Sequence, residues 1–517
     1  MSEKNLGYLA VYDVRGIQEF VFRTNKLKEN SGASTIVANI FTNALYNAIN
    51  EIKWKKEEYR IEWDTYPEFR FLTDEKIKME LLYTGAGNTY IAYRRQQDCQ
   101  KMNRFISKYV LENSYSLNLA IAVVPMKEDY EETYRELSEK LTENKAKMPM
   151  TRLVGNLSIT RQDTNTGYPF SDYRKIENDW QALSKESALK LQAFESDGEK
   201  ELDKMGTEKG SDSQIAIVHI DGNNMGKLVA SQMKNLHEYS VAVKKIRELS
   251  KSISQDFMSA LEYTENALVD FVKSDKCVFK DKWNEKTEEY RKYMRKVISS
   301  GDDITFICNA RVAISLCEIF LKKLKAGTNK FSACAGIAII NSHFPFYAGY
   351  AMAEQCCGEA KKRAKKYAED PNQVGNYIDF QICKNIMMAS DLEGSREKNY
   401  RLSDGSYLLT RPYCVDESFP KDKPKRQHID CFKNDYSFFA EETYPNNVVK
   451  GLRNAYSVSR YEADLFYRKM KSRKNNLPEG CDELFIGNEA LFFDVLEMYE
   501  LYIDVEGGVT NEKNNGN

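Results

Sequence analysis

Residues 215–227 read Ile-Ala-Ile-Val-His-Ile-Asp-Gly-Asn-Asn-Met-Gly-Lys, and residues 297–308 read Val-Ile-Ser-Ser-Gly-Asp-Asp-Ile-Thr-Phe-Ile-Cys. Each segment contains an apolar run, which predicts a buried strand, beside a turn that contains glycine. The first strand ends at Asp221, and the second segment predicts a hairpin with Asp302 and Asp303 at its tip. Carboxylates at neighbouring strand ends are suited to hold divalent metal ions, so these three are the candidate catalytic and metal-binding residues.

The turn after the first strand offers a place for phosphate groups. Gly222-Asn223-Asn224 leads into a predicted helix, and backbone N–H groups at such a junction can bind phosphate oxygens. A palm-type nucleotidyl transferase needs this combination, with Mg²⁺ or Mn²⁺ held between the carboxylates and a triphosphate. Successive strand residues point to opposite faces, so only one of Asp302 and Asp303 is expected to face the metal ions together with the first strand.

Each motif also has a purely structural interpretation. An Asp before a Gly at a strand end is often a turn former or a helix N-cap, and residues 300–303 are compatible with an ordinary hairpin turn. Lys361 and Lys365 lie one turn apart on a helix predicted over residues 346–367. Basic residues at the end of a helix complement its dipole, so spacing alone favours a solvated helix end for these two lysines.

Composition limits the class of protein. The chain has 517 residues, of which 42% are apolar, so two to four globular domains are expected. Its formal net charge is -2, which argues against an obligate nucleic-acid coat protein. Its eleven cysteines include no Cys-x-x-Cys, and its four histidines are not at ligand spacing, which favours a reduced protein without structural zinc. The sequence predicts no membrane span and no signal peptide, so we expect a cytoplasmic protein.

The order of predicted elements is repeated within the chain. Two segments read strand-helix-strand-strand-helix-strand, which predicts an α+β fold with two ferredoxin-like (βαββαβ) palms of antiparallel sheet, a helical linker region and a C-terminal helical domain. Ser34 is expected to begin the first palm's helix, which would extend over residues 34–50. The expected parts are a first palm at 1–125, a linker region at 126–213, a second palm at 214–385, a mostly helical domain at 386–505 and a disordered tail at 506–517.

The two palms differ at the hairpin turn. The first has Gly-Ala-Gly-Asn at residues 85–88, where the second has Ser-Gly-Asp-Asp at residues 300–303. The first palm therefore lacks the hairpin carboxylates and keeps only Asp13 as an acidic residue at a strand end. We interpret it as a degenerate partner and expect the chemistry in the second palm.

These motifs together resemble the large polymerase/cyclase subunit of type III CRISPR effector complexes, the Csm and Cmr assemblies, whose second palm is similar to GGDEF nucleotide cyclases. The segments that carry the resemblance to the second palm are residues 221–226, 300–303, 332–337 and 353–361. The segments that extend it over most of the chain are residues 13–22, 26–34, 166–169, 377–380, 410–413 and 445–456.

The resemblance implies an activity and a set of residues. It implies metal ligands at Asp221, Asp302 and Asp303, and triphosphate contacts from the 222–224 turn and from Lys361. For Lys361, the resemblance thus favours a role in the site over a solvated helix end. Ser300, Gly301 and Lys365 complete the predicted nucleotide site. The implied activity is the joining of ATP into a cyclic or short oligonucleotide second messenger in antiviral defence. Implied partners are an effector protein that senses the product, crRNA-complex subunits, or further copies of the chain.

The sequence also departs from the family pattern. Ser300 stands in place of the first glycine of Gly-Gly-Asp-Asp, and Asn223 stands near a position where relatives carry a further acidic residue. The cysteine-rich zinc element expected between the palms is missing. No His-Asp dipeptide of a nuclease domain occurs, so a standalone-like form without DNA cleavage is expected.

Two other functions remain open from the sequence. One is a non-catalytic subunit that binds nucleotides or the proteins of a CRISPR-type assembly. Retention of adjacent like charges at Asp302 and Asp303 weighs against it, because a palm without activity has no physical reason to keep them. The other is a cyclase that makes a dinucleotide from GTP, since the side chains that would select the base cannot be placed.

Overall fold

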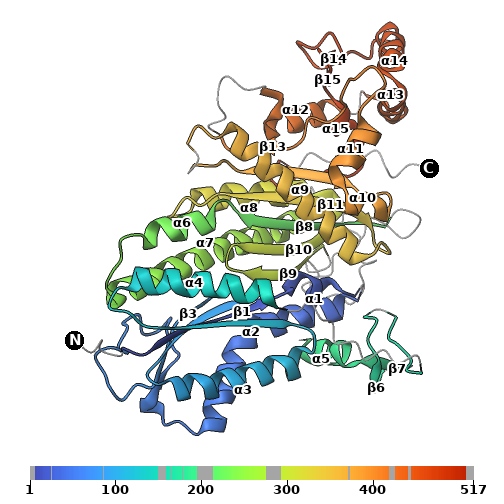
Figure 1. Ribbon diagram of the computed structural model, residues 1–517. Helices are drawn as coiled ribbons and strands as arrows, with labels where there is room; N and C mark the ends of the chain where they lie inside the picture. The colour runs from blue at the N-terminus through green and yellow to red at the C-terminus, as the bar shows by residue number, and fades with distance from the viewer. Residues whose placement is uncertain are drawn as a thin grey trace. The chain divides into compact units, whose positions relative to one another are not determined.

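This structure is a computed structural model that describes residues 6–24, 26–85, 87–148, 159–164, 166–176, 179–194, 213–274, 277, 293–370, 373–417, 425–440 and 444–507. The fold is mixed α+β with several sheets, as predicted (Figure 1). The chain divides into two units. Unit 1 is Met1–Lys200, Asn224–Gln255 and Ser300–Asp302, and unit 2 is Glu201–Asn223, Asp256–Ser299 and Asp303–Asn517. Of the expected disordered tail, residues 508–517 lie outside the described residues.

Unit 1 is built around a five-stranded sheet of order β2-β3-β4-β1-β5. The strands of this sheet are β1 (Tyr8–Arg15), β2 (Tyr59–Arg60), β3 (Met79–Gly85), β4 (Asn88–Tyr93) and β5 (Asn118–Pro125). Two further strands, β6 (Phe170–Ile176) and β7 (Asp179–Ser184), form a separate two-stranded sheet. The helices of unit 1 are α1 (Ile17–Phe22), α2 (Leu27–Ile52), α3 (Gln96–Ser114), α4 (Tyr130–Lys147), α5 (Lys185–Ala193), α6 (Met225–Met233) and the first part of α7 (Tyr239–Lys273).

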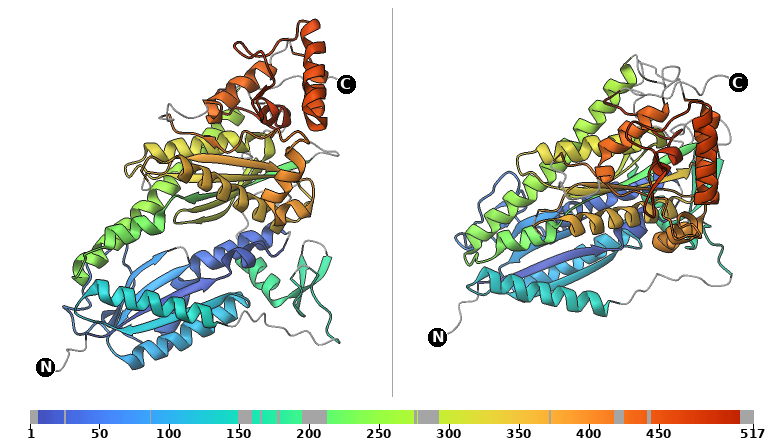
Figure 2. Two further views of the ribbon diagram at one scale, coloured as in Figure 1. Left: turned by 45° about the horizontal axis from the view of Figure 1, so that its top comes forward. Right: turned by 90° about the horizontal axis from the view of Figure 1, so that it is seen from above.

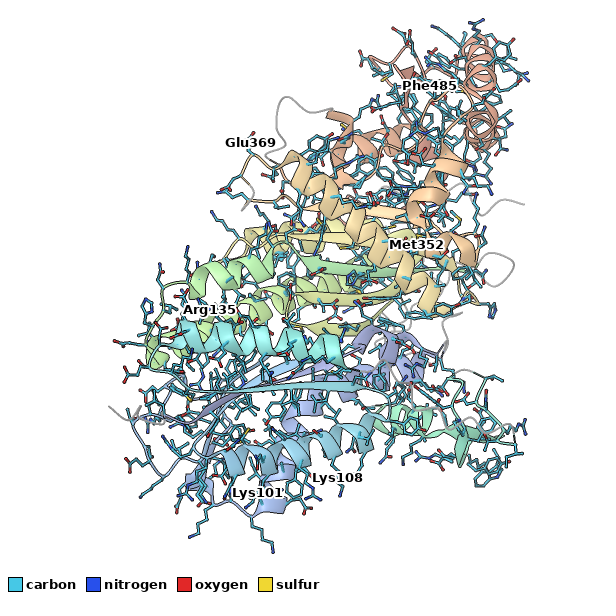
Figure 3. The ribbon with its side chains drawn as sticks, in the orientation of Figure 1. Lys101, Lys108, Arg135, Met352, Glu369 and Phe485 are labelled. Atoms are coloured by element: carbon cyan, nitrogen blue, oxygen red, sulfur yellow. The ribbon has the colours of Figure 1, made fainter. Side chains whose placement is uncertain are left out.

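Helices lie on both faces of the first sheet, with α4 on one side and α3 on the other (Figure 1). Because side chains alternate along a strand, Leu9 and Val11 of β1 point to the same face of the sheet. There they pack in one core with Tyr130 of α4 and Ala242 of α7. The helix α3 is amphipathic, with Met102 among its buried residues and Lys101 and Lys108 projecting outward (Figure 3). These packed faces hold the ends of β1 and β4 in a defined register.

Two predictions for unit 1 are wrong in detail. The helix α2 begins at Leu27 rather than at Ser34, because its first turns are buried against α5, where a Cβ on Gly32 would lie 1.8 Å from the carbonyl oxygen of Lys190. The segment 126–213, expected to be a helical linker region, also contains the antiparallel hairpin β6–β7, which contacts α5, and α5 in turn packs against α2 (Figure 2).

Unit 2 is built around a six-stranded sheet of order β13-β12-β11-β8-β10-β9. The elements of this part are β8 (Gln214–Gly222), β9 (Met294–Ser300), β10 (Asp303–Asn309), α8 (Ala313–Ala326), β11 (Ala333–Asn341), α9 (Phe346–Tyr367), β12 (Tyr377–Ile382) and β13 (Tyr413–Cys414). The central strands β8 and β11 are almost wholly buried, as their continuous apolar sequences predict. The helix α9 lies across β11, β12 and β8 (Figure 1).

The two sheets share one strand order. Unit 1 has β3-β4-β1-β5 and unit 2 has β9-β10-β8-β11, so in both the first strand of the segment lies between its third and fourth strands. Both sheets also gain strands that pair in parallel, because β2 is parallel to β3 and β12 is parallel to β11. The sheets are therefore mixed rather than purely antiparallel as predicted.

The rest of unit 2 is mostly helical. Its elements are α10 (Ile386–Ser390), α11 (Leu392–Tyr400), α12 (Ile429–Ala440), α13 (Asn446–Val458), α14 (Arg460–Ser472), β14 (Phe485–Ile486), β15 (Glu489–Ala490) and α15 (Phe493–Glu497). In the described part of the chain, no helix has both the length and the apolar character that a membrane crossing requires.

Candidate active site

Asp221 and Asp303 lie directly opposite each other. The strands β8 and β10 are antiparallel, and their register pairs Asp303 with Asp221 and Thr305 with His219. Facing residues of adjacent strands share one face of the sheet, with Cβ atoms about 4.5–5.5 Å apart. Of the two hairpin aspartates, Asp303 is therefore the strand residue that joins Asp221, whereas Asp302 precedes β10 in the turn.

Lys361 brings a positive charge to this carboxylate pair. Its Nζ atom lies 2.5 Å from Oδ2 of Asp221 and donates a 3.0 Å hydrogen bond to the carbonyl oxygen of Gly222. Burial by itself would lower the pKa of Lys361, but the charge of Asp221 and the hydrogen bond to it raise that pKa above its ordinary value. The lysine is therefore charged at neutral pH and points into the site rather than into solvent.

A close contact between α9 and β11 makes this reach possible. A Cβ on Gly336 would lie 1.9 Å from the carbonyl oxygen of Ala353 and 2.2 Å from the backbone nitrogen of Cys357. The Cys357 thiol also donates a 3.2 Å hydrogen bond to the Cys334 carbonyl oxygen. Residues 357 and 361 are one helical turn apart, so this contact sets where Lys361 lies.

His219 lies on the same face, two residues before Asp221. Its Nδ1 atom is 3.4 Å from Oδ1 of Asp303 and 3.3 Å from Oγ1 of Thr305, and its ring meets that of Tyr350 edge to face at 5.5 Å. Burial lowers the pKa of His219 to about 4, so the imidazole is neutral at neutral pH. It is a neutral neighbour of the Asp303 carboxylate, not its ion-pair partner.

The turn after β8 is held by internal hydrogen bonds. The backbone N–H of Asn223 donates to the Ser332 carbonyl oxygen at 2.8 Å, and its side-chain amide donates to Oγ of Ser332 and the carbonyl oxygen of Gly375. Asn224 caps α6 in the left-handed conformation, with φ 55°. The N–H groups of Asn223 thus donate hydrogen bonds that fix the turn. A contact of Asn223 with a nucleotide stays a prediction.

The remaining predicted residues lie nearby in the sequence. Ser300 ends β9, and Gly301 follows it with φ 63°, a left-handed conformation that favours glycine. Lys365 lies one turn beyond Lys361 on α9 and is exposed. The structure describes no contact that would test the nucleotide roles of these three residues.

The oxygen atoms at the site suit a hard divalent cation. Within the described residues, no three His, Cys, Asp or Glu side chains gather closely enough to form a metal site by themselves. Mg²⁺ is commonly bound by one or two carboxylates together with the phosphates of a substrate, not by an all-protein cage. The carboxylates of Asp221 and Asp303, with the Gly222 carbonyl, fit that mode, and Lys361 shows that the site stabilises a cation.

The first sheet repeats part of this arrangement. Asp13 at the end of β1 forms an ion pair with Lys145 of α4, Nζ to Oδ1 2.8 Å, just as Asp221 does with Lys361 of α9. Opposite Asp13 the register places Asn88, where the second sheet has Asp303. The first sheet thus carries an amide at the position of the second carboxylate, in agreement with the predicted loss of its hairpin acids.

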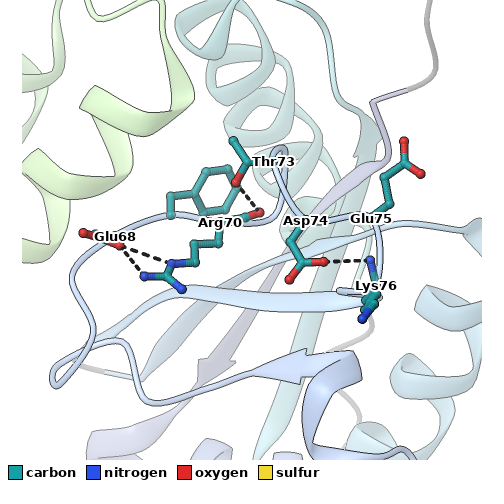
Figure 4. Close-up of a pocket in the computed structure, with 7 residues that line it drawn as sticks. Glu68, Arg70, Thr73, Asp74, Glu75 and Lys76 are labelled. Atoms are coloured by element: carbon teal, nitrogen blue, oxygen red, sulfur yellow. Dashed lines mark hydrogen bonds and ion pairs between the residues drawn. The ribbon is translucent and has the colours of Figure 1, made fainter.

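A pocket of unit 1 is unrelated to these residues. It is lined by side chains between Glu68 and Lys76, on the loop before β3 (Figure 4). Arg70 forms an ion pair there with Glu68, Nη2 to Oε2 2.7 Å, and Oδ1 of Asp74 accepts a hydrogen bond from the backbone of Lys76. These polar groups are engaged with one another, and the pocket contains none of the predicted site residues.

A strand-end carboxylate pair, a facing lysine and a βαββαβ strand order define a palm-type domain. Residues 214–369 match the sequence model of the Cas10/Cmr2 second palm domain. This match confirms the resemblance of the second palm to that of the large subunit of type III CRISPR complexes.

Solved structures show the same fold. The Csm1–Csm4 cassette in complex with pppApApA has a chain that matches with a TM-score of 0.53 and 12% sequence identity, covering 97% of this chain and 70% of that chain. The cassette in complex with cA3 matches with a TM-score of 0.53 and 12% identity, covering 96% and 70%. No curated protein matches the sequence.

The sequence analysis missed two residues that shape the site and one ion pair that repeats part of it in the first sheet. His219 could have been found, because its two-residue spacing from Asp221 places both on one face of a strand. Gly336 gave only a weak signal, a glycine inside a strand, which often marks a close backbone approach. The pairing of Lys145 with Asp13 joins residues 132 positions apart in the sequence and had no local signal.

Proposed function

We propose that this chain is a metal-dependent nucleotidyl transferase that joins ATP into a cyclic or short oligonucleotide. The observation that carries the proposal is the placement of Asp221 and Asp303 as facing residues of adjacent strands, with Lys361 2.5 Å from Asp221. This placement occurs within the segment that matches the Cas10/Cmr2 second palm domain. Two carboxylates at the ends of adjacent strands, with a lysine that reaches them from a helix, suit the transfer of a nucleotidyl group to a hydroxyl.

In this mechanism Asp221 and Asp303 would hold a divalent ion, Mg²⁺ or Mn²⁺. When bound there, such an ion would supply Lewis-acid chemistry: a lower pKa for the acceptor 3′-hydroxyl and compensation of the charge on the departing pyrophosphate. Lys361 binds a phosphate oxygen as a point charge and keeps the triphosphate in line. His219, neutral and buried, lies beside the Asp303 carboxylate.

Two features support the remaining parts of the proposal. We interpret both sheets as ferredoxin-like palms, of which the first, with Asn88 facing Asp13, is a degenerate partner without metal chemistry. The Csm1–Csm4 cassettes that share this fold were solved with adenine oligonucleotides, which supports ATP over GTP as the substrate. The product would act as a messenger in antiviral defence, with a companion subunit of the CRISPR assembly and a messenger-sensing effector as partners.

Incubation of the purified chain with each nucleoside triphosphate and Mg²⁺ or Mn²⁺ tests the proposal, with products resolved by chromatography and mass spectrometry. We expect a cyclic or linear oligoadenylate and pyrophosphate. A guanine dinucleotide would instead support the GTP-using alternative. Nucleotide binding measured by calorimetry without any product, in the presence and absence of target RNA and companion subunits, would support the non-catalytic alternative.

A further inference from the structure

The Lys361 ammonium lies where a metal ion would be expected. It contacts Oδ2 of Asp221 at 2.5 Å and the carbonyl oxygen of the next residue, Gly222, at 3.0 Å. A carboxylate oxygen and a backbone carbonyl oxygen are hard ligands of the kind that divalent cations take. The side chains are only partly exposed, 22% for Lys361 and 40% for Asp221, so the pair is less screened than a surface ion pair.

The first sheet provides an internal comparison for this pair. Lys145 contacts Asp13 at the equivalent strand end, on a helix that likewise follows the fourth strand of the repeat. In that sheet the residue that faces Asp13 is the uncharged Asn88, so the positive charge of Lys145 balances the single negative charge of Asp13. In the second sheet the facing residue is Asp303, so the same lysine arrangement leaves the two facing carboxylates with a net negative charge.

We propose that Lys361 holds one cation position of the second palm in the nucleotide-free chain and that a divalent ion displaces it from Asp221. The two cations compete because both use Oδ2 of Asp221 and the Gly222 carbonyl, and because like charges so close together repel. Displacement frees the ammonium for the triphosphate. The role in nucleotide binding rests on the proposed function, whereas the competition for Asp221 does not.

This competition predicts opposite effects of one substitution on two ligands. Lys361→Met removes the resident cation and keeps an unbranched side chain, so Mn²⁺ should bind the nucleotide-free chain about tenfold more tightly than it binds the wild type. The same variant lacks the charge that holds the triphosphate. Its affinity for a non-hydrolysable ATP analogue, at saturating Mn²⁺, should fall by about tenfold or more.

Two matched controls distinguish an effect of the position of Lys361 from an effect of losing one positive charge. Lys365→Met removes the same charge from the same helix one turn away, and Lys145→Met opens a site that has a single carboxylate. Both should leave Mn²⁺ affinity within about twofold of the wild type, since neither frees a ligand of the Asp221 and Asp303 pair. Lys361→Gln is the second variant at the position itself, and it should also gain Mn²⁺ affinity.

Free Mn²⁺ in titrations of the full chain is counted by electron paramagnetic resonance, with the fold of each variant checked by circular dichroism. Tighter Mn²⁺ binding in Lys361→Met and Lys361→Gln, and not in the controls, is the expected result. Unchanged or weaker Mn²⁺ binding in a folded Lys361 variant overturns the proposal, as does an equal gain in Lys365→Met. These titrations contain no nucleotide, so their outcome is independent of whether the chain turns over ATP.

Discussion

At the scale of single residues, Asp435 on α12 is a buried acid whose ionisation should affect stability. Burial raises its pKa to about 6, although Arg426 lies 2.8 Å away and acts in the opposite direction. The pKa in the folded chain is thus above the ordinary value of 3.8. The folded chain binds more protons than the unfolded chain between these two values, so the stabilising contribution is complete below about pH 4 and is lost as the pH rises through about 6.

Asp435→Asn should remove this pH dependence. When the pH is lowered from 7 to 4, we expect the free energy of unfolding of the wild type to rise by up to about 3 kcal/mol relative to that of the variant. Denaturant unfolding of both proteins across this range measures the difference. Asp430→Asn, an exposed acid on the same helix, is the control and should keep the wild-type profile. Parallel pH profiles for the wild type and Asp435→Asn would contradict the prediction.

Candidate residues of the site could be recognised from the sequence where they belong to a local pattern. Asp221, Asp302 and Asp303 stand beside glycine turns at the ends of apolar runs, and that pattern is visible without any tertiary contact. The choice between Asp302 and Asp303 was not predictable, because it depends on the register between β8 and β10. Lys361 could be assigned to the site only through the family resemblance. The sequence of a basic helix end is the same whether its lysines face solvent or a carboxylate.

At the scale of elements, the contact of α9 with β11 positions Lys361, and it requires glycine at position 336. Gly336→Ala would place its Cβ 1.9 Å from a backbone oxygen of α9, so the helix must move. We expect a loss of about 1–3 kcal/mol in stability and weaker binding of an ATP analogue. Thermal unfolding and calorimetric titration measure the two effects.

Gly358→Ala on α9 is the matched control. A Cβ at that position meets no atom within 4 Å, and alanine favours a helix over glycine. The variant should therefore be as stable as the wild type or more stable by up to about 1 kcal/mol, with unchanged nucleotide affinity. Equal behaviour of Gly336→Ala and Gly358→Ala would show that the close contact does not position the lysine.

Elements were predictable in proportion to the regularity of their apolar pattern. The helix α9 and the strand β8 have long, clear patterns, and the structure places them where the sequence does. The hairpin β6–β7 was missed because its sequence is charged and its strands face solvent, with Tyr173 and Trp180 stacked on each other instead of in a core. The start of α2 was missed because burial against α5, a tertiary effect, extends the helix before Ser34.

At the scale of the whole molecule, unit 2 depends on a buried ionic network. Arg411 is fully buried and bonds to Asp494 at 3.1 Å and Glu497 at 2.7 Å, which lie on α15. These contacts join the sheet region to the C-terminal helices within the unit. Their long sequence separation explains why no local pattern predicted them.

Arg411→Met should strongly destabilise unit 2. Removing the arginine leaves two carboxylates buried without their cation, which costs about 3–5 kcal/mol. Arg401→Met, which breaks an exposed ion pair with Glu397, should change stability by no more than about 0.5 kcal/mol. Denaturant unfolding of the full chain compares the two variants. A similar small effect of both would show that the buried network adds nothing to the stability of the unit.

The proposed chemistry is tested most directly by the rate of oligoadenylate formation from ATP and Mn²⁺ in the wild type, in Asp303→Asn and in Glu359→Gln. Asp303 faces Asp221, whereas Glu359 is a partly exposed acid on α9 that pairs with Lys362. We predict that Asp303→Asn slows product formation by at least about a hundredfold with an intact fold, and that Glu359→Gln stays within about twofold of the wild type. Equal rates in the wild type and Asp303→Asn would contradict the assignment of this carboxylate pair as the catalytic centre.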